Sequence, residues 1–152
     1  MRKESTEKLI IGVGNAFRGD DGVGLIVAQR LRELTLPGVT VLEQSGEGAA
    51  LVESWEDAGR VIVVDAVSSG SEPGKIHRFE AAGRPLPALF SGGSTHAFGL
   101  AEAVELARQL NRLPPSLVIY GIEGKSFDLG TGLSPEVESA VEILTERIAR
   151  EL

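Results

Sequence analysis

The chain has 152 residues, a net charge of −7 and no cysteine. This length suits a single domain, residues 1–152, with its own hydrophobic core. The negative charge argues against binding to nucleic acid or to an anionic membrane. The lack of cysteine excludes disulfides, thiolate metal sites and a cysteine nucleophile. The charged N-terminus leads into an apolar run too short for a signal peptide or a membrane span, so we expect a cytoplasmic protein.

Apolar runs rich in β-branched residues alternate with longer helical patterns along the chain. In chain order they predict a strand at 9–13, a helix at 22–34, a strand at 39–42, a helix at 48–55 and a strand at 61–64. An alternating segment after a Pro-Gly turn predicts an edge or antiparallel strand at 75–79. The last predicted elements are a helix at 95–113, a strand at 117–122 and a helix from Ser134 to the C-terminus.

Proline and serine mark two ends of these predicted helices. Pro114 and Pro115 are expected to end the third helix, because proline lacks the N–H that a helix needs. Ser134 and Pro135 form an N-cap and first-turn pair at the start of the last helix. Strands that alternate with helices predict an α/β fold, a three-layer domain around a mostly parallel, five-stranded sheet.

Three polar features follow predicted strands or begin predicted helices, where α/β proteins place their ligands. Asp20 and Asp21 follow the glycine-containing loop after the first strand, Asp65 directly follows the third, and His96 lies at the start of the third helix. Each has a simpler explanation, namely helix capping for one of the paired aspartates, a turn cap for Asp65 and a packing role for His96. Nothing in the sequence singles out His77, the other histidine.

Together these features predict a metal site. Two carboxylates that converge on one crevice repel each other unless a cation lies between them. An imidazole beside them completes a set of one nitrogen and at least two oxygen donors, which suits Ni, Zn, Mn or Fe(II) better than calcium. Such a site leaves coordination positions for water or substrate.

Two other types of site fit the sequence poorly. A dinucleotide fingerprint would need a third glycine where the chain has Phe17, and no P-loop motif is present. A serine hydrolase would need Gly-x-Ser-x-Gly, but Glu43 stands two residues before Ser45.

The segments GVGNAFRGDDGVG, VIVVDAV, STHAFGL and GLSPEV, in this order and spacing, resemble those of the hydrogenase maturation proteases. The resemblance runs from about residue 8 to the C-terminus. Members of this family remove the C-terminal extension of the large subunit of nickel–iron hydrogenases after nickel has been inserted. The resemblance implies a three-layer α/β/α sandwich around a twisted, mixed sheet, and a metal-dependent endopeptidase.

The family's metal-contacting positions fall on Asp21, Asp65 and His96, which the resemblance implies are also the catalytic residues. It further implies that nickel arrives with the substrate, the hydrogenase large-subunit precursor, and that no nucleotide cofactor is needed. We expect neither nucleic acid nor membrane as a partner, and we expect a monomer.

The resemblance also implies a substrate loop, made of Gly14, Asn15, Ser45, Gly46 and Gly48. After the second strand the family often has an acidic residue followed by Gly-Gly-Thr, whereas this chain has Gln-Ser-Gly at 44–46. This departure concerns the identity of the substrate rather than the reaction.

Two alternative functions remain open from the sequence. Peptidyl-tRNA hydrolases also begin with a strand and a Gly-x-Gly-Asn turn, but a tRNA-binding crevice should be basic and this chain carries −7. A hydrogenase assembly factor that binds the nickel-loaded subunit without cutting it would use the same three residues.

Overall fold

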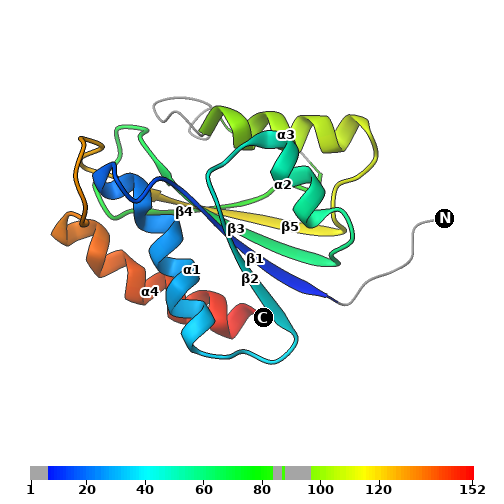
Figure 1. Ribbon diagram of the computed structural model, residues 1–152, viewed down its shortest axis with the longest axis horizontal. Helices are drawn as coiled ribbons and strands as arrows, with labels where there is room; N and C mark the ends of the chain where they lie inside the picture. The colour runs from blue at the N-terminus through cyan, green and yellow to red at the C-terminus, as the bar shows by residue number, and fades with distance from the viewer. Residues whose placement is uncertain (1–6, 84–86, 88–96) are drawn as a thin grey trace.

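The computed structural model describes residues 7–83, 87 and 97–152, which form one sheet with helices on both faces (Figure 1). The strands are β1 (Lys8–Val13), β2 (Val39–Gln44), β3 (Arg60–Val67), β4 (Ile76–Glu80) and β5 (Ser116–Glu123). The helices are α1 (Val23–Glu33), α2 (Gly48–Trp55), α3 (Ala97–Gln109) and α4 (Pro135–Glu151), with a short 3-10 helix, η1 (Gly19–Gly22), before α1.

The sheet is mixed and has the strand order β2-β1-β3-β5-β4. Neighbouring strands run parallel except β4, which pairs antiparallel with β5 at one edge. This arrangement confirms the predicted mostly parallel, five-stranded sheet, and it confirms that the segment near residues 75–79 is an antiparallel edge strand.

Apolar residues of the central strands face both layers of helices, which explains their unbroken hydrophobic runs. Ile10, Ile62 and Val64 pack with residues of α1 and α4 in one core cluster. Ile11 and Val63 pack with residues of α2 and α3 in the other. Figure 1 shows α1 and α4 on one face of the sheet and α2 and α3 on the opposite face.

The strands that follow β1 in the chain lie on both sides of it in the sheet. The connection through α1 places β2 on one side of β1, and the connection through α2 returns the chain to β3 on the other side. After β1 the chain passes through η1 and α1 to β2 on one side, whereas after β3 it continues to β4 on the other side, so the two segments leave the carboxyl ends of these neighbouring strands in opposite directions. In open α/β sheets this is where a crevice for ligands forms.

Several predicted boundaries need correction, and among the strands β2 runs to Gln44 rather than to residue 42. Helix α1 begins at Val23, because residues 19–22 form η1. Helix α3 ends at Gln109 rather than near residue 113. Asn111 adopts a left-handed conformation with φ 58°, and the N–H of Arg112 donates to the carbonyl of Ala107 at 2.7 Å. This cap closes the helix before the two prolines are reached.

The end of β3 also differs from the prediction, which placed it before Asp65. The strand continues to Val67, and residues 60–67 all pair with β5. Main-chain pairing tolerates the aspartate, so Asp65 lies inside the strand. None of the described helices is long and apolar enough to cross a membrane.

Candidate functional site

Asp65 is a fully buried carboxylate near the carboxyl end of β3, with 0% of its surface exposed. Its Oδ1 accepts a hydrogen bond from the N–H of Ala66 at 2.8 Å. Val63 and Val67 belong to the core cluster beneath α2 and α3, so Asp65, which lies between them, points to the same face. The strand therefore presents an acid toward the layer that contains α3.

Asp21 lies in η1, directly beyond the end of β1, and is 3% exposed. Its carbonyl accepts a hydrogen bond from the N–H of Asn15 at 3.4 Å, and its own N–H donates to the carbonyl of Arg18 at 3.1 Å. A Cβ at Gly14 would lie 2.2 Å from the Asp21 carbonyl oxygen, so glycine is required there. Because η1 also packs against β3, the fold brings the Asp21 segment to the strand that carries Asp65.

Asp20 has a structural role that differs from the predicted helix cap. Its carboxylate accepts hydrogen bonds from the N–H groups of Lys125 (2.8 Å), Ser126 (2.9 Å) and Ser134 (2.7 Å), and from the Ser134 hydroxyl (2.8 Å). Burial alone would raise the pKa of Asp20, but these hydrogen bonds outweigh it and lower that pKa below its ordinary value. Asp20 thus fixes the loop between β5 and α4. Ser134 is the N-cap residue of α4 and Pro135 follows it in the first turn, as predicted, but the Ser134 hydroxyl donates to Asp20 and makes no capping bond to the helix.

The predicted substrate loop divides into two parts. Asn15 lies beside Asp21 and shapes the turn before η1, since its Oδ1 accepts a hydrogen bond from the N–H of Phe17 at 2.9 Å. On the other side, Gly46 and Gly48 lie against the first turn of α3, where a Cβ on Gly99 would come within 2.0 Å of the Gly46 carbonyl oxygen. Ser45, between β2 and these glycines, is exposed.

The predicted ligands are therefore only partly described by the structure. Asp21 and Asp65 lie at the same edge of the sheet, by the carboxyl ends of β1 and β3, where α/β proteins place their ligands. His96, the predicted nitrogen donor, lies outside the described residues and directly precedes α3 in the sequence. Within the described part of the chain, no three His, Asp or Glu side chains come close enough to hold a metal ion. Two buried carboxylates are suitable oxygen donors for a divalent metal, but a third donor must come from elsewhere.

Sequence reasoning missed a further polar cluster at this edge, formed by Ser69, His77 and Glu123. Glu123 ends β5 and is 2% exposed. Its Oε2 accepts a hydrogen bond from the N–H of Ser69 at 2.7 Å, its Oε1 accepts one from the Ser69 hydroxyl at 2.5 Å, and His77 Nε2 lies 3.2 Å from Oε1. The pattern that pointed to Asp65, an acid directly after a buried apolar run, also applies to Glu123.

Comparisons with known proteins place the chain in a family. The family model described as hydrogenase maturation protease matches residues 25–151. A putative hydrogenase maturation protease of Methanocaldococcus jannaschii is 35% identical over 150 residues, covering 95% of each chain. The hydrogenase 2 maturation protease of Escherichia coli is 29% identical over 144 residues, covering 92% of this chain and 87% of the relative.

Solved structures share the fold over nearly the whole chain. The hydrogenase maturating endopeptidase HybD of E. coli has a TM-score of 0.81 at 27% identity, covering 93% of this chain and 89% of that one. The nickel–iron hydrogenase maturation protease HybD of Thermococcus kodakarensis has a TM-score of 0.74 at 25% identity, covering 95% and 97%. The three-layer arrangement expected from the sequence is therefore the arrangement of these peptidases.

Proposed function

The chain belongs to the hydrogenase maturation protease family, and on this premise we propose that it removes the C-terminal extension of a nickel–iron hydrogenase large-subunit precursor. The observation that carries the proposal is the burial of Asp21 and Asp65 at the carboxyl ends of the neighbouring strands β1 and β3. Buried carboxylates are costly to keep charged, and proteins retain them mainly where a partner or a cation compensates them.

We propose that this cation is the nickel of the loaded precursor, contacted by Asp21, Asp65 and His96. The protein then contributes an incomplete ligand set, and the substrate brings the metal together with its remaining ligands. This arrangement would let the peptidase distinguish a loaded precursor from an empty one, because the two carboxylates repel each other less when a divalent ion lies between them.

In this proposal the metal acts as a Lewis acid on the scissile carbonyl or on a water molecule. The role of the chain is positioning. Gly14 allows the Asp21 main chain to approach closely, and β3 holds Asp65 within a regular ladder. The main chain of both residues is therefore fixed before the substrate arrives, which reduces the entropic cost of assembling the site.

The test is to incubate the purified chain with nickel-loaded and nickel-free precursor and to measure the intact mass of the precursor. We expect the loaded form alone to lose its C-terminal extension. Asp21→Ala and His96→Ala should abolish the mass change, whereas Glu142→Ala, which alters an exposed carboxylate on α4, should not.

The other outcomes test nickel recognition, peptidase activity and the site residues separately. Equal cleavage of both precursor forms would refute nickel recognition and retain the peptidase. Tight binding without any mass change would instead support a non-cleaving assembly factor. Full processing by Asp21→Ala or His96→Ala would show that the substituted residue is not part of the site.

A further inference from the structure

A row of three residues crosses the sheet at the same level as the proposed site. Asp65 on β3 pairs with Gly121 on β5, and Gly121 pairs with His77 on β4. Paired residues of neighbouring strands point to the same face, so His77 and Asp65 share the face covered by α2 and α3. Strands lie about 4.8 Å apart, which places the His77 main chain about 10 Å from that of Asp65. Gly121 contributes no side chain to the row between them.

Glu123 determines how the His77 ring is held. Each oxygen of the Glu123 carboxylate already accepts a hydrogen bond from Ser69. The carboxylate therefore accepts, rather than donates, the hydrogen bond that it shares with the His77 ring. His77 Nε2, at 3.2 Å from Oε1, is therefore the donor and carries the proton. In the neutral ring the other nitrogen, Nδ1, is then left with a lone pair and can accept a hydrogen bond.

The ring is also placed where a bound chain could reach it. The His77 side chain is 14% exposed, whereas Glu123 beneath it is 2% exposed. In the antiparallel pair, His77 lies opposite Gly121, and its contact with Glu123 directs the ring toward the carboxyl end of β5. This is the edge of the sheet at which Asp65 and Asp21 lie.

We propose that His77 is a substrate-positioning residue of the peptidase site, whose Nδ1 accepts a hydrogen bond from a backbone N–H of the bound precursor. The inference rests on the proposed function. A peptide segment is the ligand class that fits, because an extended chain offers an N–H donor at regular intervals. The distance of about 10 Å between the main chains of Asp65 and His77 is short enough for one such segment to reach both. Glu123 acts through His77, by fixing the ring and its tautomer.

A purely structural role makes a different prediction, and two variants of one residue distinguish the two. His77→Gln places an amide group near the position of Nε2, keeping a donor for Glu123 while removing the acceptor at Nδ1. His77→Asn places its amide near the position of Nδ1 and gives up the contact with Glu123. The first variant therefore tests substrate contact, and the second tests the anchor.

The experiment measures kcat, KM and Tm for cleavage of the nickel-loaded precursor by the wild type and both variants. We expect His77→Gln to raise KM about fivefold, the size of one lost hydrogen bond, with kcat and Tm close to those of the wild type. His77→Asn should lower Tm and change KM less than His77→Gln does.

The inference is overturned if His77→Gln keeps the wild-type KM, or if KM rises only in the variant that loses stability. Either result would leave the proposed function intact, because the wild type would still cleave. A wild-type chain that leaves the precursor uncut would instead overturn the proposed function and this inference with it.

Discussion

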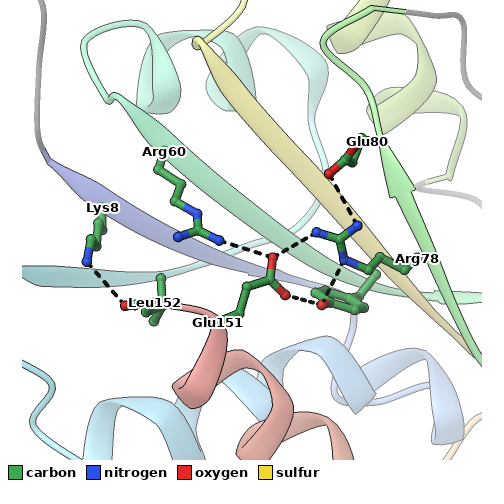
Figure 2. A network of polar contacts seen from close by, with 7 residues as sticks. Lys8, Arg60, Arg78, Glu80, Glu151 and Leu152 are labelled. Atoms are coloured by element: carbon green, nitrogen blue, oxygen red, sulfur yellow. Dashed lines mark hydrogen bonds and ion pairs between the residues drawn. The ribbon is translucent and has the colours of Figure 1, made fainter.

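The two ends of the sheet differ in the sign and the pairing of their charged residues. At the carboxyl end of the parallel strands, the buried charged residues of the described chain are all acidic: Asp20, Asp21, Asp65 and Glu123. Near the amino ends of β1 and β3, charges of both signs meet and neutralise one another around Glu151 (Figure 2). At the amino end the paired charges fasten the fold. At the carboxyl end Asp20 and Glu123 are held by hydrogen bonds within the fold, whereas Asp21 and Asp65 are the acids that we propose meet a ligand.

The network at the amino end connects the last residues of α4 and the residue after it to four strands. Glu151 on α4 forms ion pairs with Arg60 at 3.3 Å and with Arg78 at 3.0 Å, and it accepts a hydrogen bond from the Tyr120 hydroxyl. Burial raises the pKa of Glu151, but the hydrogen bonds from Tyr120 and Arg78 outweigh it and lower that pKa. Lys8 Nζ donates to the Leu152 carbonyl at 3.3 Å, so β1 joins the same network (Figure 2).

The largest effect should follow from Asp65→Asn. The variant keeps the shape of the side chain and an oxygen that accepts from Ala66, but it removes the negative charge that the proposed site requires. We expect cleavage of the precursor to fall about 1,000-fold, equivalent to about 4 kcal/mol, while Tm stays close to that of the wild type. Measuring kcat/KM and Tm for the wild type and the variant checks this. A variant with a clearly lowered Tm as well as a lowered kcat/KM would point to a structural role for Asp65.

Asp20→Ala should give the next largest effect, on stability. Three N–H groups of the loop between β5 and α4 lose their acceptor, which we expect to lower the free energy of unfolding by about 3 kcal/mol. Urea unfolding at neutral pH measures this. A loss below about 1 kcal/mol would show that water replaces the carboxylate without cost.

The lowered pKa of Asp20 also predicts the pH dependence of its contribution. Because the folded state favours the charged form, the stabilisation is present above the unfolded pKa of about 3.9 and is lost as the pH falls through the lower, folded pKa. The stability difference between the wild type and Asp20→Asn should therefore shrink below about pH 4. A difference that stays constant down to acid pH would contradict this assignment.

Glu151→Gln should have a smaller effect, confined to the other end of the sheet. It removes the charge that faces Arg60 and Arg78, so we expect the free energy of unfolding to fall by about 1 to 2 kcal/mol. Cleavage at a temperature where the variant is folded should be unchanged. Reduced cleavage by fully folded Glu151→Gln would show that the two ends are not independent.

Arg30→Ala should have the smallest effect and serves as a surface control. Arg30 pairs with Glu142 between α1 and α4, but their side chains are 45% and 67% exposed. Exposed pairs contribute about 0.5 kcal/mol or less, so chemical denaturation should barely distinguish the variant from the wild type. A loss above about 1 kcal/mol would mean that this pair carries more of the contact between the helices than its exposure indicates.

The sequence predicted the central sheet well because β1, β3 and β5 are covered on both faces, which makes each an unbroken apolar run. Asp65 was found for the same reason, as an acid directly after such a run. The end of α3 was misplaced because the left-handed Asn111, rather than a proline, terminates the helix. His77 and Glu123 could not be paired in advance, since their contact depends on the antiparallel register of β4 and β5.

The most direct test of the contrast between the two ends is one assay on three proteins. Nickel-loaded precursor is incubated with equal amounts of folded wild type, Asp65→Asn and Glu151→Gln, and its intact mass is followed over time. We expect the wild type and Glu151→Gln to remove the same C-terminal mass at similar rates, while Asp65→Asn leaves the precursor intact. Cleavage by Asp65→Asn at the wild-type rate would contradict this expectation.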